Sequence, residues 1–350
     1  MFGLYHVVRH EQNMYFFYPK SGKLLYRIWQ NRQNRQNRQD RQNEQIGQNE
    51  WGGHFSPEAV LHSGIRRLYS VFFIENVLHV FGQDVQGNVL LFVYREGQWS
   101  HRSVLQASGD VLFTPMAAGK GMSFVCNAHT DPENPSLIKQ SMDDNGKWLP
   151  PEVIDHFKPF GYLPYEAQAT APTHMLLFYQ ANTDDCQIGY REITPTRTGV
   201  FRRFFNGHGR LVDYSFLTTH DALHLLMIIK DPFSCQLLYR KKTETDFTPS
   251  VLLWESPKIS QCLLSWVRGE IHATCMTGGK LQRAISTNGG DSFAEIKQYK
   301  RKFCVDPVKA NFISTDESEK SWFARQVYVD SEAPWDVQMI PDLCTDFYPA

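Results

Sequence analysis

Acidic residues recur at equivalent turns along this sequence. The candidates in these turns, and in the loops that we expect beside them, are Asp84, Asp110, His129, Asp131, Asp184, Asp185, His208 and Asp231. Carboxylates gathered on one face would hold a cation, a sugar or a basic peptide, and two of them about 5 to 10 Å apart would suit glycoside hydrolysis. The competing explanation is structural, because Asp is a preferred turn residue that hydrogen-bonds its own backbone. Both alternatives stay open at this point.

Sequence motifs for other chemistries are missing. The chain has no Gly-x-Ser-x-Gly elbow, phosphate-binding loop, Gly-x-Gly-x-x-Gly fingerprint or His-Glu-x-x-His pair. Its seven cysteines show no Cys-x-x-Cys spacing and no zinc-ligand spacing with histidine. We therefore expect no cofactor and no metal, and we assign no catalytic residue.

Composition limits the partners of the chain. Lys and Arg number 36 against 37 Asp and Glu among 350 residues, and this balance gives no electrostatic footprint for nucleic acid or an anionic membrane. The first ten residues show no signal-peptide pattern, and apolar runs such as Leu225–Ile229 are far shorter than the roughly 20 residues that span a bilayer. We expect a cytoplasmic monomer with reduced thiols and no membrane span.

The elements that must position these side chains recur as a repeat. Short apolar segments bounded by Gly, Asn or Asp predict four strands at Leu68–Ile74, Val77–Phe81, Val89–Tyr94 and Trp99–Leu105. First strands of further repeats begin near Tyr5, Val111, Tyr165, Asp213, Ser260 and Val308, and after the first repeat the intervals are about 43 to 54 residues. This is the length of one four-stranded propeller blade. The sequence predicts one all-β domain over residues 1–350, a β-propeller of about seven four-stranded blades, with six as the alternative.

Aromatic residues follow the third turn of several repeats. Trp99, Trp148 and Phe293 each stand just after a Gly or Asp at the start of the predicted fourth strand. A bulky ring at a fixed register would fill the seam between neighbouring blades. The last repeat lacks a clear fourth strand, and residues 2–8 are the candidate to complete it.

One of these hairpins resembles a known motif. Residues 286–293 are similar to the Asp box of sialidase-type propellers, Ser/Thr-x-Asp-x-Gly-x-Thr-Trp, through Ser286, Gly290 and Phe293, with Ser292 in place of Thr and Asn288 in place of Asp. The box is a folding motif whose polar side chains cap the hairpin away from the catalytic face. The resemblance therefore implies a sialidase-like propeller architecture rather than an activity. The arginine context of a sialidase active site is absent from the sequence.

Residues 30–50 interrupt the first repeat. Asn-Arg-Gln repeats as a triplet from Asn31 to Gln39 within this segment, and Ile46 is the segment's one apolar residue. A tract of this composition cannot bury a core, so we expect a disordered low-complexity insertion. Its arginines make it the one place where we would expect contact with RNA or an acidic surface.

The sequence thus favours a non-catalytic binding scaffold for an unknown protein or glycan ligand. A carbohydrate-active enzyme that uses carboxylates on one face of the propeller is the alternative.

Overall fold

The computed structural model shows an all-β chain, as predicted. It describes residues 5–10, 13–31, 53–74, 76–106, 112–118, 121–128, 135–143, 145, 147–158, 165–171, 173–181, 186–219, 222–243, 247–294, 297–298, 307–314, 322–324, 326–330 and 337–338. Within these residues every regular element is a β-strand. By its internal contacts the chain divides into two compact units, one made of Met1–Val104, Ser265–His272 and Tyr299–Ala350, the other of Leu105–Leu264 and Ala273–Gln298.

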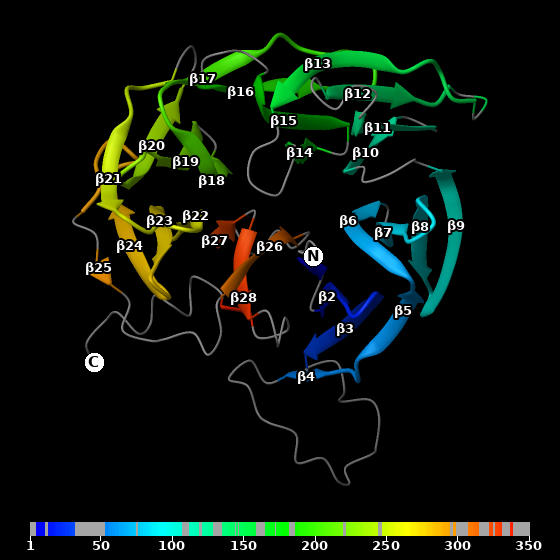
Figure 1. Cartoon of the computed structure of the whole chain (residues 1–350). Helices are drawn as coiled ribbons and strands as arrows, with labels where there is room; N and C mark the ends of the chain where they lie inside the picture. Colours follow the sequence, from blue (N-terminus) through cyan, green and yellow to red (C-terminus); the bar gives the residue numbers. More distant parts are fainter. Residues whose placement is uncertain are drawn as a thin grey trace, which may run out of the picture. The chain divides into compact units, whose positions relative to one another are not determined.

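Consecutive strands form four-stranded antiparallel sheets. In the first unit one such sheet contains, in chain order, β6 (Ile65–Ile74), β7 (Val77–Asp84), β8 (Asn88–Arg95) and β9 (Gln98–Gln106) (Figure 1). The β8–β9 turn is a tight hairpin in which Glu96 and Gly97 have φ of 52° and 83°. Positive φ at both central residues gives the turn that matches the twist of the flanking strands, and glycine adopts it without strain.

The sheet at the start of the chain also contains strands from its end. Its members are β1 (Tyr5–His10), β2 (Asn13–Lys20), β3 (Lys23–Asn31), β4 (Gly53–Phe55), β5 (Ala59–Ser63), β26 (Pro307–Ser314), β28 (Gln326–Asp330) and β29 (Val337–Gln338). β1 pairs antiparallel with β2 on one edge and parallel with β26 on the other. A further strand, β27 (Trp322–Ala324), pairs antiparallel with β22 (Cys262–Val267). C-terminal strands therefore occupy the edges of β1 and β22 that do not pair with β2 and β23.

The second unit continues the same four-strand pattern. An eight-stranded sheet contains β10 (Phe113–Ala118), β11 (Gly121–Ala128), β12 (Ser136–Ser141), β13 (Glu152–Lys158), β14 (Glu166–Ala171), β15 (His174–Ala181), β16 (Cys186–Ile193) and β17 (Arg202–Gly207). It is one sheet because the end of β13 pairs with the end of β15. The next sheet contains β18 (Arg210–Thr218), β19 (Leu223–Lys230), β20 (Cys235–Lys242) and β21 (Val251–Ser256). A last sheet contains β22 and β27 with β23 (Glu270–Thr277), β24 (Lys280–Ser286) and β25 (Lys297–Gln298), and its residues belong to both units.

Apolar side chains pack sheet against sheet within each unit. In the second unit, residues of β15, β16 and β17 share one buried cluster with residues of β18, β19 and β20. The rings of Phe178 and Phe216 stack in this cluster, with centroids 3.5 Å apart. In the first unit, residues of β1, β2 and β3 share a second cluster with residues of β6, β7 and β8. Each sheet of these pairs buries one face against its neighbour, and this burial is the main source of its stability.

The predicted repeat agrees with the observed strands. Each of the seven predicted starts lies in or within three residues of the first strand of a repeat, namely β1, β6, β10, β14, β18, β22 and β26. Two of the predicted aromatic plugs contact the preceding sheet. Trp99 contacts Tyr26 of β3 at 5.5 Å between ring centroids, and Phe293 contacts Tyr239 of β20 at 4.6 Å. The ring contact of Trp148 is with Phe124 of its own sheet.

Two sequence predictions need correction, the start of the insertion and the pairing of the N-terminal strand. Gln30 and Asn31, predicted to begin the insertion, belong to β3, where Gln30 lies opposite both Asn13 and His54. The rest of the insertion, 32–50, lies outside the described residues. The N-terminal strand does not add a fourth strand to the last repeat, because β1 pairs instead with β26, the first strand of that repeat.

Two further observations concern membrane-spanning helices and free thiols. In the part of the chain that the structure describes, no helix has the length and apolarity needed to cross a bilayer. Four cysteines, Cys126, Cys235, Cys262 and Cys275, are buried free thiols.

We expect Trp99 to stabilise the seam between the first two sheets. Its ring lies 4.9 Å from Tyr94, 5.5 Å from Tyr26 and 6.1 Å from Phe17. Because the ring is half-buried, Trp99→Ala should reduce the free energy of unfolding by an amount near the lower end of the about 3 to 5 kcal/mol typical of buried Trp truncation. Trp99→Phe, which keeps a ring, should lose less. Denaturant melts that place Trp99→Ala within about 0.5 kcal/mol of the parent would contradict the seam role.

Candidate functional site

The Asp84 carboxylate forms hydrogen bonds within its own hairpin. The residue is 6% exposed, and its Oδ1 accepts hydrogen bonds from the backbone N–H of Gln86 at 2.9 Å and of Asn88 at 2.8 Å. Its Oδ2 accepts a third bond from the Asn88 side chain at 2.8 Å. Burial alone would raise the pKa of Asp84, but these hydrogen bonds and the nearby His62 outweigh burial and lower it. Asp84 therefore fits the structural alternative, in which the carboxylate stabilises its own turn.

Most of the other predicted rim residues cannot be placed. Asp110, His129, Asp131, Asp184 and Asp185 lie outside the described residues. Asp231 and His208 are described, and both belong to loops at one end of the β18–β21 sheet. The two ends of this sheet have different chemistry.

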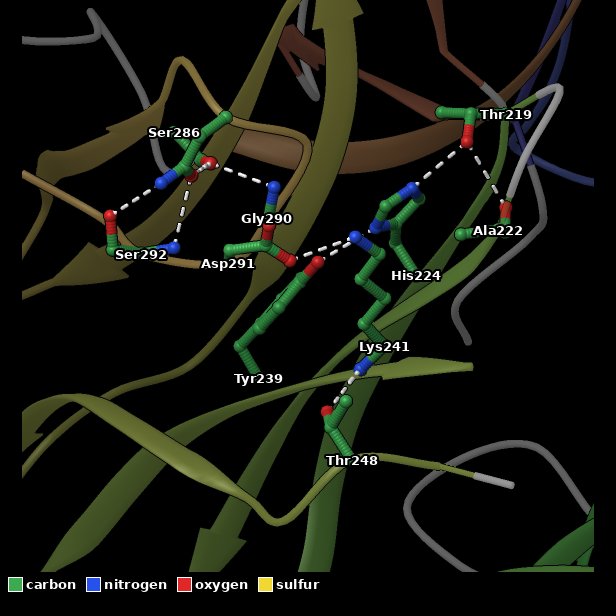
Figure 2. Close-up of polar contacts among 11 residues, drawn as sticks. Thr219, Ala222, His224, Tyr239, Lys241, Thr248, Ser286, Gly290, Asp291 and Ser292 are labelled. Carbon is green, nitrogen blue, oxygen red and sulfur yellow. Dashed lines mark hydrogen bonds and ion pairs between the residues drawn. The ribbon is translucent and has the colours of Figure 1, made fainter. Parts of the chain in front are cut away.

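The hairpin after β24 is capped by its own polar side chains, as the motif resemblance implied (Figure 2). The Gly290 N–H donates to Ser286 Oγ at 2.8 Å, and that hydroxyl donates to Asn288 Oδ1 at 2.9 Å. Asn288 Oδ1 also accepts the Ser292 N–H at 3.0 Å, while its Nδ2 donates to Ser292 Oγ at 2.8 Å. Asn288 thus caps the turn through both its side-chain oxygen and its side-chain nitrogen. The bonds are local to the turn and stabilise it.

A buried polar ladder lies beside this hairpin, at one end of the β18–β21 sheet (Figure 2). His224 is 1% exposed, with Nδ1 2.7 Å from the Tyr239 hydroxyl and Nε2 3.0 Å from Thr219 Oγ1. One neutral tautomer satisfies all three groups: Nε2–H donates to Thr219, whose hydroxyl donates to the Ala222 carbonyl at 3.2 Å, and Nδ1 accepts from Tyr239. Burial, with the Lys241 charge, lowers the pKa of His224 to about 4 against an opposing effect of Asp291.

This end of the sheet is built for packing. A Cβ at Gly290, where φ is +88°, would overlap the Tyr239 hydroxyl. Lys241 Nζ and Asp291 Oδ1 close the outer side with a 2.9 Å ion pair. Burial raises the pKa of Tyr239 as it lowers that of His224, so neither group is charged near neutral pH. The ladder therefore joins the β18–β21 sheet to the next hairpin and presents no group to a ligand.

The opposite end of the same sheet carries Asp231. Lys230 follows His224 by six positions along β19, about 20 Å of extended chain. Asp231 begins the β19–β20 turn, where its N–H donates to the Ser234 carbonyl at 2.9 Å. Its carboxylate lies against the backbone of Gly209, where a Cβ would stand 2.6 Å from Asp231 Oδ1 and 2.8 Å from Ile229 Cγ2. Gly209, with φ of +103°, leaves the space that this carboxylate occupies.

The side chains at this end are open to a ligand. Phe233, in the same turn, is 93% exposed. His208 and Arg210 flank Gly209 and are exposed. Within the described residues, the Asp231 carboxylate makes no hydrogen bond or ion pair. We call the set Phe233, Asp231, His208 and Arg210 the rim site.

Sequence reasoning missed two features of the second unit. Phe233 gave no periodic signal, although an aromatic between Pro232 and Ser234 in a turn is itself unusual. The second feature joins β13, β15 and β16: Arg191 Nη2 pairs with Asp155 Oδ2 at 2.7 Å, and the Tyr179 hydroxyl donates to the same oxygen at 2.6 Å. Arg191 Nε also donates to Tyr179 at 2.7 Å, so the three groups satisfy one another and act in packing.

No metal site accompanies these groups in the described ranges. Among those residues no three His, Cys, Asp or Glu side chains are arranged to hold an ion. The rim site therefore offers an apolar ring, a carboxylate and cationic donors as its means of recognition.

Comparisons with known proteins bear on the fold. No family model and no curated protein sequence matches the chain. Among solved structures, the polysaccharide lyase Uly1 matches with a TM-score of 0.53 at 6% identity, over 94% of this chain and 87% of that one. A six-bladed β-propeller lectin of Aleuria aurantia with a fucose recognition mode gives 0.44 at 11%, over 84% and 93%. The lectin SapL1, in complex with methyl fucoside, gives 0.48 at 8%, over 84% and 96%.

The order of the sheets defines the fold. Successive four-stranded antiparallel sheets that pack face to face are the blades of a β-propeller, and the chain has this fold. At such low identity the likeness concerns the fold alone. The sheet order supports the propeller part of the predicted resemblance, and the sialidase-like family remains a prediction.

Gly290→Ala should test the tight approach of the hairpin to Tyr239. The matched control is Gly269→Ala, where φ is +90° and nothing lies within 4 Å of the added Cβ. Both variants place a Cβ at nearly the same positive φ, so the difference between them reports mainly the steric overlap. We expect Gly290→Ala to lower the free energy of unfolding by about 1 to 3 kcal/mol more than the control. Equal melts would show that the hairpin does not pack on Tyr239.

His224 should make the free energy of unfolding depend on pH. Its folded pKa of about 4 lies below the unfolded value of 6.5, so the unfolded state binds more protons between these values. The contribution of His224 to the free energy of unfolding is therefore fully present above about pH 6.5. It falls by about 3 kcal/mol, the amount that corresponds to a shift of this size, as the pH drops through about 4.

Urea unfolding of the parent and of His224→Gln across this range should separate this contribution from that of other groups. We expect the difference between the two curves to shrink as the pH falls. Parallel curves would mean that His224 titrates normally.

Proposed function

We propose that the chain is a non-catalytic β-propeller scaffold that binds a carbohydrate at the rim site. The observation that carries this proposal is the solvent-exposed ring of Phe233 beside the unpartnered carboxylate of Asp231. A large apolar ring with 93% of its surface in water gains nothing for folding, and such exposure often marks a binding surface.

The chemistry of the rim site suits a sugar. The apolar C–H face of a pyranose covers an aromatic ring and removes both surfaces from water. The Asp231 carboxylate accepts charge-assisted hydrogen bonds from hydroxyls, and His208 and Arg210 donate to ring or hydroxyl oxygens. A peptide would also cover Phe233, but the donors and acceptors at this end of the sheet favour a polyhydroxylated ligand.

Binding explains the described groups better than catalysis does. Glycoside hydrolysis needs two working carboxylates. Of the predicted carboxylates that the structure describes, Asp84 gives both oxygens to its own turn, which leaves Asp231. These observations support the scaffold over the carbohydrate-active alternative.

Phe233→Ala should abolish binding and leave folding intact. The side chain is almost fully exposed, so its removal should shift the thermal melt by less than the uncertainty of the measurement. Asp231→Asn keeps an acceptor and should weaken binding with a normal melt. The control is Val200→Ala, which truncates another exposed apolar residue, 70% exposed and located in the β16–β17 connection.

A glycan array probed with the purified chain would identify the ligand, and titration calorimetry of the three variants would locate its site. Loss of binding in Phe233→Ala but not in Val200→Ala is the expected result. Full binding in Phe233→Ala, or no carbohydrate bound by the parent chain, would refute the proposal.

A further inference from the structure

Two cations stand opposite each other at the rim. Arg210 of β18 pairs directly with Lys230 of β19, and both are exposed. Directly paired residues have Cβ atoms about 4.5 to 5.5 Å apart, and like charges in this position destabilise a sheet. Within the described residues, neither cation forms an ion pair with a carboxylate. The fold holds two positive charges together without neutralising them.

A third cation is linked to the same edge through the next strand. Lys230 also pairs with Cys235 of β20, whose thiol lies 3.8 Å from the Pro257 carbonyl. Lys258 follows Pro257 and is exposed. The connection from β21 to β22 therefore brings a further Lys to the strand end that carries Lys230.

Asp231 does not neutralise this group because it lies on the other face of the sheet. Neighbouring residues of a strand point to opposite faces, so Ile229 and Lys230 diverge. A Cβ added at Gly209 would contact both the Asp231 carboxylate and the Ile229 side chain, so this carboxylate lies on the Ile229 face of the sheet. The exposed Phe233 stands in the turn between β19 and β20, with the carboxylate on one side of the sheet and the cations on the other.

We propose that the rim site selects an acidic saccharide, whose carboxylate or sulfate ester binds Arg210 and Lys230. This inference rests on the proposed function, because it concerns the ligand of the same site. The planar guanidinium of Arg210 binds carboxylate or sulfate oxygens through two parallel N–H donors, and Lys230 adds a point charge. The acidic group removes the repulsion between the two cations while the sugar ring covers Phe233 and its hydroxyls reach Asp231.

The test compares a galacturonic acid trisaccharide with its methyl ester, which keeps the sugar and removes the charge. Calorimetry should show the acid binding about tenfold more tightly than the ester. The double variant Arg210→Gln/Lys230→Gln should reduce this ratio to near one, because it weakens binding of the acid more than binding of the ester. The control, Lys147→Gln/Arg197→Gln, removes two exposed charges from turns at the opposite strand ends and should keep the preference.

Failure of the inference is distinct from failure of the proposed function. Equal binding of acid and ester, lost in Phe233→Ala, would overturn the acidic selectivity and leave the carbohydrate site standing. No binding of either sugar or of any array glycan would overturn both. If an oligouridylate of equal charge displaced the trisaccharide with the same affinity, the cations would serve polyanions in general, which also overturns the proposal.

Discussion

Burial of both faces of a sheet is the constraint on which this structure depends. In β19 six consecutive residues, His224–Ile229, are buried, so alternate side chains on both faces lie away from water. One face packs on β15–β17 in the shared aromatic cluster, and the other faces the next repeat, where the backbone N–H of Cys262 donates to Asp213 at 2.8 Å. A sheet of this kind cannot exist alone, and repetition along the chain supplies its neighbours.

The sequence predicted what is local. Strand positions followed from short apolar segments and their turns, so Leu68–Ile74 and β6 end at the same residue, and the capping of residues 286–292 followed from polar side chains in one hairpin. Non-local pairing carried no such signal. Nothing in residues 5–10 indicates that β1 pairs in parallel with a strand 300 residues later. Asp84 and Asp231 also read alike as turn carboxylates, because sequence does not show that one is enclosed by its turn.

The two ends of the β18–β21 sheet divide stability from recognition. At one end His224, Tyr239 and Thr219 satisfy one another beneath the capped hairpin (Figure 2). At the other end Phe233 is exposed and Arg210 faces Lys230. A rigid sheet between them holds the exposed groups at fixed spacing, which lowers the entropy cost of binding a ligand.

A crystal structure of the chain with a bound acidic oligosaccharide tests the central claim most directly. The account predicts a sugar ring on the face of Phe233, with a hydroxyl on Asp231 and the acidic group between Arg210 and Lys230. A sugar bound at another sheet, or at the His224 end of this one, with Phe233 still in water, would contradict it.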